Sequence, residues 1–357
     1  MASSTPAVLR VCRGRRPHDT IRGLIMFRHH PRTALAALLV TGIALAGCSR
    51  GEALESGGAA EPFAEPVTIS NCEREATYTG PPQRIVSMND HVTETLIQLG
   101  AGDRIVGMGY GDQNDVLPEV ADQFHAIPSL AAEYPSWEQI VDLEPDLVVA
   151  GMRSAFDEKE GRSRDALESA GIHTFLFSEY CGEGFPDLSM LETDFSQLGR
   201  VLDVEQGARD LTDRIRGQVE DVRATLDAAG VTGIPTFFYD SGEAEPMTIG
   251  GVGIGQLIGE YAGADNIFSE GDKPYPKTTW EVLGERQPEA IVVLDYGATS
   301  AEDKIAYLRA QPVMATTPAI RENRIVVVPL ADFFESSRMA TSVETIAREL
   351  HPHAFGQ

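Results

Sequence analysis

The chain has 357 residues, of which 42% are hydrophobic and 23% charged, and its formal net charge is −25 at pH 7. This length has room for two ordinary domains. The acidic excess argues against a nucleic-acid partner, because such partners are held by lysine and arginine contacts to phosphates. A solvated acidic coat, of the kind that suits high salt, explains the excess and leaves the charge of any small ligand open.

The first segment has the pattern of a secretory signal. Basic residues precede an apolar stretch over 33–47, which ends in the sequence LAGC. A basic start, a short apolar core and small residues before a cleavage point mark such a signal, and the stretch is shorter than the roughly 20 residues of a membrane-spanning helix. We therefore expect residues 1–47 to be a lipoprotein signal peptide, with Met26 as an alternative start to Met1.

Cys48 ends a sequence that is similar to the bacterial lipobox, whose cysteine is acylated and becomes the mature N-terminus. Lipid on Cys48 would attach the protein to the outer face of a membrane without embedding it. Residues 48–65 are rich in Gly, Ala, Ser and Glu and show no apolar periodicity, so they are predicted to be a flexible tether.

Export also bears on the remaining cysteines. Cys12 lies in the signal, so Cys72 and Cys181 are left in the exported chain. In an oxidising compartment we expect these two to form a disulfide. The alternative is two ligands of a metal site, but that site lacks the closely spaced Cys or His partners that zinc favours.

Strand-like and helix-like segments alternate over 66–187, which we predict to be an N-terminal α/β lobe. The strand-like apolar runs lie over 84–88, 104–110, 146–151 and 172–177. Between the first two, Asn89 or Asp90 can cap a helix that ends at Gly100. Alternation of this kind predicts a parallel sheet covered by helices.

The segment 188–229 has no strand signal. From Leu191 to Leu226 its apolar residues recur at steps of three and four, or multiples near them, along one face. The pattern predicts one long helix or two abutting helices, with a kink near Asp203 or Gly207. We expect this segment to be a rigid linking helix between two lobes.

Alternation resumes over 230–357, the predicted C-terminal α/β lobe. Predicted strands lie over 235–242, 290–297 and 324–330, and predicted helices over 254–263, 301–311 and 336–350. The predicted fold class is therefore α/β, with two similar Rossmann-like lobes joined by a long α-helix. Ligands of such folds bind at the carboxyl ends of strands and between domains, so we expect a ligand cleft between the lobes.

A repeated motif supports the two lobes. Residues 134–151 read YPSWEQIVDLEPDLVVAG and residues 275–294 read YPKTTWEVLGERQPEAIVVL. The chain's only two tryptophans, Trp137 and Trp280, occupy matching positions in these segments. Their separation of 143 residues is too long for a solenoid or propeller repeat and suits one small domain.

Several ordered motifs together carry a family resemblance: RIVSMNDHVTETLIQLGAGDRIVGMGY, the two tryptophan-containing segments and RIVVVPLADFF. Over about 67–350 the chain resembles the helix-linked substrate-binding proteins of ABC importers for iron–siderophore complexes and cobalamin. The resemblance implies a monomeric, lipid-anchored extracytoplasmic receptor that delivers a metal chelate to a permease dimer with a cytoplasmic ATPase. It implies no resident cofactor, and the chain has no GxxxxGK[ST] nucleotide loop.

By the same resemblance, the expected ligand-binding residues lie in turns after predicted strands. They are Met88, Asn89, Asp90, His91, Tyr110, Glu133, Tyr134, Met152 and Arg153 from the first lobe and Tyr239, Tyr275, Asp332, Phe333 and Phe334 from the second. Aromatic walls with few polar groups suit a large, flat or apolar chelate. The alternative for each residue alone is a role in the core or in a helix cap. Arg153 either contacts an anionic chelate or is a solvated arginine of a mixed-charge loop.

An iron–siderophore complex is the first expected ligand, with a corrinoid, haem or a deazaflavin precursor as alternatives. A bare metal ion fits less well, because His91, His125 and His173 are scattered along the chain. An exported enzyme is the rival class, since Asp90 beside His91 could act as an acid–base pair. The chain has no GxSxG or HExxH motif, and we predict no catalytic residues.

Two glutamates are the expected contacts to the permease. In cobalamin-binding relatives, an acidic residue seven positions before a proline in each lobe meets arginines of the two permease subunits, and the matching residues here are Glu138 and Glu281. A two-fold symmetric partner is contacted well by two similar side chains, one from each lobe. The alternative is local, because a glutamate in a first helical turn, after a Ser136 or Thr278 cap, is favoured by the helix dipole.

Overall fold

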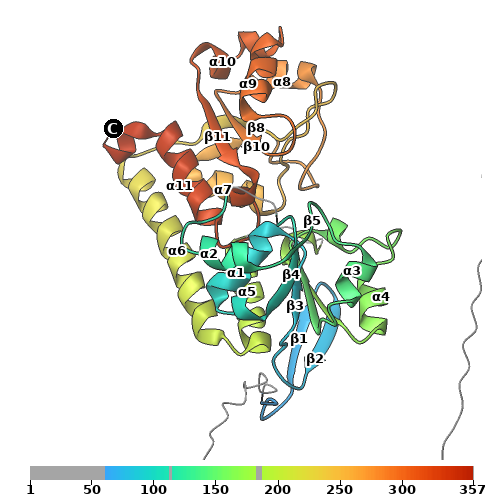
Figure 1. The fold of residues 1–357 in the computed structure, drawn as a ribbon. Helices are drawn as coiled ribbons and strands as arrows, with labels where there is room; N and C mark the ends of the chain where they lie inside the picture. The colour runs from blue at the N-terminus through green and yellow to red at the C-terminus, as the bar shows by residue number, and fades with distance from the viewer. Residues whose placement is uncertain (1–60, 112–114, 182–186, 357) are drawn as a thin grey trace, which may run out of the picture. The chain divides into compact units, whose positions relative to one another are not determined.

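The computed structural model describes residues 61–111, 115–181 and 187–356 (Figure 1). The predicted signal peptide, Cys48 and most of the predicted tether lie outside the described residues. Within these ranges, no helix combines the length and the hydrophobicity that a membrane crossing requires.

The described chain begins with an antiparallel hairpin that the sequence analysis did not predict. Strands β1 (Val67–Asn71) and β2 (Arg74–Tyr78) pair across a two-residue turn in which Cys72 and Glu73 have φ of 50° and 63°. Positive φ at both positions is the geometry of the hairpin turns that match strand twist. Cys72 forms a disulfide with Cys181, with Cα atoms 5.0 Å apart, which confirms the predicted bond.

The first lobe contains a parallel sheet of five strands in the order β5-β4-β3-β6-β7. The strands are β3 (Ile85–Ser87), β4 (Ile105–Gly109), β5 (Ser129–Ala131), β6 (Leu147–Ala150) and β7 (His173–Leu176). All residues of β3 and β6 are buried, as expected where helices cover both faces of a parallel sheet. The order reverses between β3 and β6, so these adjacent strands flank a topological switch point.

Four helices connect the strands of the first lobe: α1 (Asp90–Leu99), α2 (Ala121–Ala126), α3 (Trp137–Val141) and α4 (Arg164–Ser169). As predicted, α1 begins after Asn89 and ends at Gly100, whose φ of 96° is readily adopted only by glycine. The Asn89 side chain does not cap the helix. Its Oδ1 instead accepts a hydrogen bond from the Gly151 amide at 3.0 Å, which fastens the end of β3 to the end of β6.

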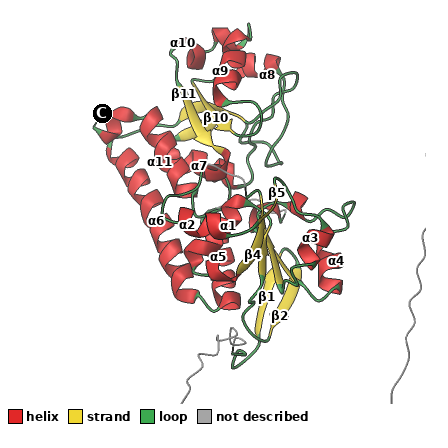
Figure 2. Ribbon diagram, in the orientation of Figure 1, coloured by secondary structure: helices red, strands yellow, loops and turns green. Residues whose placement is uncertain are grey.

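The second lobe contains a separate parallel sheet in the order β11-β10-β8-β9 (Figure 2). Its strands are β8 (Ile234–Tyr239), β9 (Ala264–Asn266), β10 (Ala290–Asp295) and β11 (Ile325–Pro329), and its helices are α7 (Ile254–Ala262), α8 (Trp280–Arg286), α9 (Ala301–Ala310) and α10 (Pro318–Arg321). The switch point of this sheet lies between β8 and β10. Two separate parallel sheets confirm the predicted α/β class with two lobes.

The segment 188–229 divides into two helices with different neighbours. A break at Asp203, with φ of 56°, separates α5 (Ser189–Leu202) from α6 (Glu205–Ala228). Helix α5 packs beside α6 and against β1 of the first lobe, whereas α6 contacts α1 of the first lobe and α7 of the second. The break lies where the sequence predicts a kink between two abutting helices, and α6, with 24 residues or about 36 Å, contacts helices of both lobes.

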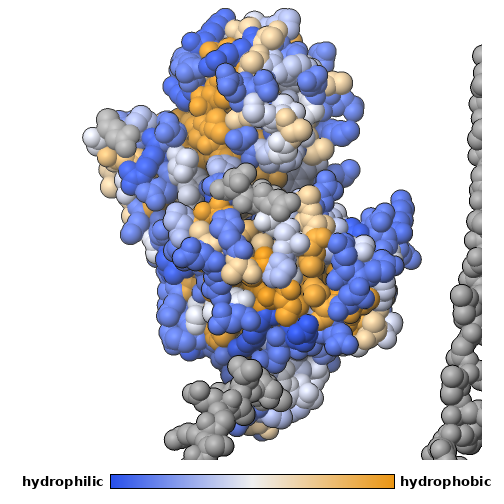
Figure 3. Space-filling model, viewed as in Figure 1, coloured by the Kyte–Doolittle hydropathy of each residue, from blue (hydrophilic) through white to orange (hydrophobic). Residues whose placement is uncertain are grey.

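Helix α11 (Met339–Leu350) belongs to the second lobe and packs along α6 (Figure 1). Buried side chains of α1, α6, α7 and α11 join one hydrophobic cluster, which includes Leu96, Leu211, Leu257 and Ile346. Packed helices therefore hold the two lobes together. On the face shown in Figure 3, hydrophilic residues cover most of the surface and hydrophobic residues gather in patches on both lobes near the middle of the view.

Candidate ligand-binding site

A cavity of about 520 Å³ lies at the carboxyl ends of strands from both sheets. Its lining residues are Asn89, Asp90, His91, Tyr110, Asp115, Ala132, Glu133 and Met152 from the first lobe and Asp295, Tyr296, Gly297, Pro329, Leu330, Ala331 and Phe334 from the second. These residues follow β3, β4, β5 and β6, or end or follow β10 and β11. Open parallel sheets bind ligands at this edge, next to the switch points, and the volume suits a small-molecule site.

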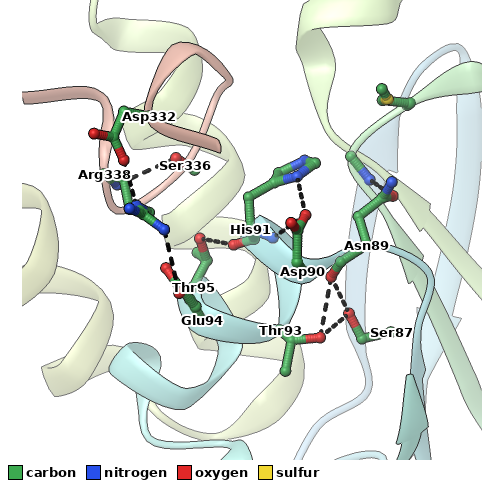
Figure 4. Close-up of polar contacts among 12 residues, drawn as sticks. Ser87, Asn89, Asp90, His91, Thr93, Glu94, Thr95, Asp332, Ser336 and Arg338 are labelled. Atoms are coloured by element: carbon green, nitrogen blue, oxygen red, sulfur yellow. Dashed lines mark hydrogen bonds and ion pairs between the residues drawn. The ribbon is translucent and has the colours of Figure 1, made fainter. Parts of the chain in front are cut away.

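The turn between β3 and α1 forms one wall. The Asp90 carboxylate accepts a hydrogen bond from the His91 amide at 2.8 Å and lies 3.2 Å from His91 Nδ1 (Figure 4). Burial alone would raise the pKa of Asp90, but the hydrogen bonds and charge of His91, with the charge of Arg338, outweigh it and lower the pKa. Asp90 is therefore a charged acceptor at neutral pH.

His91 connects the two lobes within the cavity wall. Its ring is 1% exposed and stacks on Phe334 of the second lobe, with ring centroids 4.5 Å apart. The ring also lies against Gly151, where an added Cβ would come within 2.0 Å of His91 Nε2. Only glycine fits at that strand end. His91 Nε2 is buried and has no hydrogen-bond partner among the described residues.

Tyr110 follows β4 and has φ of 54°, and its amide donates to the Glu133 carbonyl at 3.2 Å. Its ring meets Tyr134 edge-on at a centroid distance of 5.1 Å. Burial first, then the neighbouring Tyr134 and Glu133, raise the pKa of Tyr110 to about 12, so its hydroxyl stays protonated. Tyr134 supports this ring from outside the cavity and bonds Ser154 through its hydroxyl at 2.8 Å.

Tyr296, directly after β10, is an aromatic wall residue of the second lobe. It is 36% exposed, and its hydroxyl donates to the Asp240 carboxylate at 3.0 Å. Lys304 Nζ lies 4.1 Å from the centroid of the Tyr296 ring and donates to the carbonyls of Asp240 and Leu294 at 2.8 and 2.6 Å. These contacts fix the orientation of the ring, so it can offer a preorganised aromatic surface to a ligand.

Arg338 joins the lobes beside the cavity. From the second lobe it reaches the first-lobe carboxylates of Glu94 and Asp115, at 3.4 and 3.1 Å. It also pairs with Asp332, and Figure 4 shows its contacts to Glu94 and Asp332. Arg338 is 5% exposed. Burial raises the pKa of Glu94 to about 7, and the charge of Arg338 opposes that rise. The buried Arg338 guanidinium thus forms ion pairs with carboxylates from both lobes.

A second contact between the lobes joins two glutamates, each of which accepts a hydrogen bond from the backbone amide of the other. The Glu179 amide donates to Glu335 Oε2 at 2.9 Å, and the Glu335 amide donates to Glu179 Oε2 at 3.3 Å. Asp194 is nearby and accepts from the amide and hydroxyl of Ser178 at 2.6 and 2.7 Å. Burial raises the pKa of Glu179 to about 8 and that of Asp194 to about 6, and burial with the charge of Asp194 raises the pKa of Glu335.

The cavity brings together half of the residues expected from the sequence. Asn89, Asp90, His91, Tyr110, Glu133, Met152 and Phe334 line it. Met88, Tyr239 and Phe333 are not in the lining, and each is at most 2% exposed and packs in a hydrophobic core.

The remaining expected residues lie outside the lining as well. Asp332 is used by Arg338, Arg153 donates to the Tyr180 carbonyl, and Tyr275 packs against the core. The sequence analysis also missed Asp115, Ala132, Asp295, Tyr296, Gly297, Pro329, Leu330 and Ala331. Most of these residues end or follow a predicted strand. The AIVVLDYG run, for example, could have predicted that Asp295 and Tyr296 lie at a strand end and therefore near a ligand.

Glu138 and Glu281 have matching positions in the two lobes. Each follows a tryptophan in the first turn of its helix, α3 or α8, and each is exposed. Among the described residues neither forms an ion pair. The cap of α3 is Ser136, as expected, but that of α8 is Thr279 and not Thr278, because the Thr279 hydroxyl accepts from the Val282 amide at 3.4 Å.

No group of three or more His, Cys, Asp or Glu side chains that could hold a metal ion occurs in the part of the chain that the structure describes. The cavity has one histidine, His91, and its carboxylates come from separate strand ends.

Comparisons with known proteins agree with this fold. The sequence pattern of the Periplasmic binding protein family matches residues 85–330. The chain is 26% identical over 229 residues to the "Vitamin B12-binding protein" of Vibrio campbellii, covering 64% of this chain and 76% of that one. It is 23% identical over 327 residues to the "Uncharacterized ABC transporter substrate-binding lipoprotein YvrC" of Bacillus subtilis, covering 90% of this chain and 97% of that one.

Among solved structures, the chain is similar to that of an ABC-type Fe3+-hydroxamate transport system from Saccharomonospora viridis. The TM-score is 0.68 and the sequence identity 23%, and the likeness covers 82% of this chain and 99% of that one. At this identity the likeness establishes the fold, with both lobes included.

Proposed function

From the premise that the chain belongs to the periplasmic binding protein family, as a substrate-binding protein of the ABC-importer type, we propose that its cavity captures a metal chelate outside the cytoplasm. An iron–siderophore complex is the proposed cargo, and a corrinoid is the second candidate. Haem and a deazaflavin precursor remain alternatives of the same fold. Members of this family bind and release their ligands, and we propose no catalytic role for Asp90 or His91.

The observation that carries the proposal is the position of the cavity, where strand ends of both lobes supply its walls. A ligand held there touches both lobes at once. Tyr110, Tyr296 and Phe334 give aromatic surface, and Met152 and Leu330 add apolar surface. Such walls suit the organic shell of a chelate, and the named ligands of the two similar proteins, vitamin B12 and Fe3+-hydroxamate, are both chelates.

Binding is tested by titrating the purified protein with a ferric trihydroxamate, with cyanocobalamin and with haem, followed by calorimetry and by native mass spectrometry. We expect one chelate to bind with one-to-one stoichiometry. Tyr296→Ala should weaken that binding by about tenfold or more, because it removes a fixed aromatic wall. Tyr307→Ala removes a tyrosine outside the cavity lining and serves as the control. Failure of all three chelates to bind would contradict the proposal.

We further propose that Glu138 and Glu281 contact the permease dimer of the importer. Their exposure, their matching places in α3 and α8 and their lack of ion pairs in the described structure support this role. A local role at the helix start is also present, since hydrogen bonds there lower the pKa of Glu281. The two roles are compatible, and the double variant considered in the Discussion separates them.

Attachment to the membrane through lipid on Cys48 is the remaining part of the proposal. Support comes from the LAGC sequence and from the lipoprotein named among the similar proteins. Expression in a bacterial host with a labelled fatty acid should label the wild-type protein and leave Cys48→Ser unlabelled. Equal labelling of the two proteins would contradict the anchor.

A further inference from the structure

Three carboxylates of the cavity lining form no ion pair with a lysine or an arginine of the described structure, although the charge of Arg338 acts on Asp90 from farther away. Asp90, Glu133 and Asp295 all line it, the first two from the first lobe and the third from the second. In the described part of the chain, the ion-pair partner of Asp90 is His91, and Glu133 and Asp295 have none. The cavity therefore presents negative charge from both sides.

The basic side chains near the cavity are all used elsewhere. Arg338 pairs with Glu94, Asp115 and Asp332. Asp115 is the fourth carboxylate of the cavity lining, and it is the one that has an arginine partner. Lys304 is 4% exposed, with its Nζ on two backbone carbonyls. Arg153, the residue that an anionic chelate would have needed, donates to a backbone carbonyl and is not part of the lining.

A second observation concerns His91. Its Nδ1 faces the Asp90 carboxylate at 3.2 Å, where only a ring N–H can make a hydrogen bond. The other ring nitrogen, Nε2, is buried beside Gly151 and has no partner in the described structure. The hydrogen bond to Nδ1 keeps the Asp90 carboxylate fixed at the cavity wall. The Tyr110 pKa, raised first by burial and also by Glu133 and Asp90, agrees with a negative potential.

We propose that this cavity selects its chelate by charge, with Asp90, Glu133 and Asp295 as specificity-determining residues that favour a cationic chelate and disfavour an anionic one. The inference rests on the proposed function and narrows it. An anionic chelate in this cavity would be repelled by these carboxylates, because like charges repel strongly where little water separates them. The repulsion would weaken the binding of anionic chelates relative to cationic ones. A pendant ammonium group or a cationic metal centre would be attracted by the same carboxylates.

The test uses three ligands that share one iron centre. Ferrioxamine B carries a pendant ammonium group and one net positive charge, its N-acetyl derivative is neutral, and its N-succinyl derivative carries one negative charge. Calorimetry with the wild-type protein should give the order cationic, neutral, anionic, with a loss of roughly tenfold in affinity at each step. The differences should shrink at high salt, as expected for charges near solvent.

The variants are Glu133→Gln and Asp295→Asn, alone and together, since neither carboxylate is used in an ion pair of the described structure. The double variant should reduce the ratio of cationic to anionic affinity by about tenfold or more. Glu349→Gln is the control, because it removes an exposed charge near the far end of α11. It should leave the ratio unchanged.

The outcomes separate the charge selection from the chelate function. Equal affinity for the three ligands, tighter binding of the anionic one or an unchanged ratio in the double variant would overturn the charge selection and leave the chelate function standing. If no trihydroxamate binds, the same comparison is made with neutral cyanocobalamin and cationic aquacobalamin. Absence of binding to both sets would overturn the charge selection, and absence of haem binding as well would overturn the chelate function.

Discussion

The repeated segments of the two lobes fold alike where they face outward and differ where they end at the cavity. In both, a Ser or Thr cap begins a short helix at a tryptophan followed by glutamate, and a buried strand comes next. Strand β6 ends at Ala150 and is followed by Gly151, whereas β10 ends at Asp295 and is followed by Tyr296. The two lobes therefore share the same order of helix cap, helix and strand, but the side chains at their strand ends differ.

The contacts between the lobes show the same asymmetry. Arg338 of the second lobe is the cation, and the first lobe supplies Glu94 and Asp115 as its carboxylates. A buried charge that loses its partner is strongly destabilising. The largest effect is therefore expected from breaking this contact.

Arg338→Met should lower the free energy of unfolding by about 3–5 kcal/mol, because Glu94 and Asp332 then remain buried without a cation. Urea unfolding at neutral pH measures the change. Arg348→Met, in the helix that follows Arg338, is the control, because its exposed pair with Glu344 should contribute about 0–1 kcal/mol. Equal losses of unfolding free energy in the two variants would show that the Arg338 ion pairs between the lobes stabilise the fold no more than the exposed pair of Arg348 with Glu344.

The strand-end glycines provide a direct comparison of the lobes. Gly151→Ala should destabilise by about 1–3 kcal/mol and weaken ligand binding, since the new Cβ would meet the buried His91 ring. Gly297 has φ of 74° and open space around it, so Gly297→Ala should cost only about 1 kcal/mol of backbone strain. Urea unfolding and chelate titration of both variants check this. A larger effect at Gly297 would reverse the comparison.

The feature that the lobes share is tested by uptake. Glu138→Ala combined with Glu281→Ala should leave chelate affinity unchanged and reduce transport by about tenfold or more, because both contacts to a symmetric permease are lost. The charge-matched control is Glu302→Ala with Glu349→Ala, in which Glu302 also lies in a first helical turn. Uptake of a radiolabelled chelate by cells measures the effect. Equal uptake by the two double variants would refute the docking role.

A smaller effect is expected from pH. The pKa of Glu179, about 8, and that of Asp194, about 6, are both raised by burial, so the folded protein holds protons that the unfolded chain releases near pH 4–5. Stability from these groups is complete below that range and is lost as pH rises toward about 8. Glu179→Gln stays neutral and should flatten this fall, which is of order 1–3 kcal/mol. Urea unfolding at several pH values checks it, and an unchanged slope would contradict the assignment.

The sequence predicted those elements whose signal is local. Apolar runs located β6, β10 and β11, and helical periodicity with a terminal glycine located α1 and α7. It missed β5 and β9, because these short strands read SLA and ADN and contain no continuous apolar run. The hairpin of β1 and β2 was missed as well, since its turn has none of the usual Asn-Gly or Asp-Gly signals.

Half of the candidate site could not be predicted because it depends on how the lobes pack. Met88 and Asn89 are neighbours at one strand end, yet the first enters the core and the second meets Gly151. Phe333 and Phe334 divide in the same way, with only Phe334 in the cavity lining. A family pattern identifies such turns, whereas the direction of each side chain follows from the backbone and from the opposite lobe.

The central claim is that a chelate binds at the facing strand ends of both lobes. Hydrogen exchange with and without a saturating chelate tests this most directly. The account predicts added protection at the turns around 89–91, 110 and 152 in the first lobe and around 296–297 and 330–334 in the second. Protection confined to one lobe, or to the groove of about 350 Å³ between α5 and α6 near Glu192 and Arg209, would contradict it.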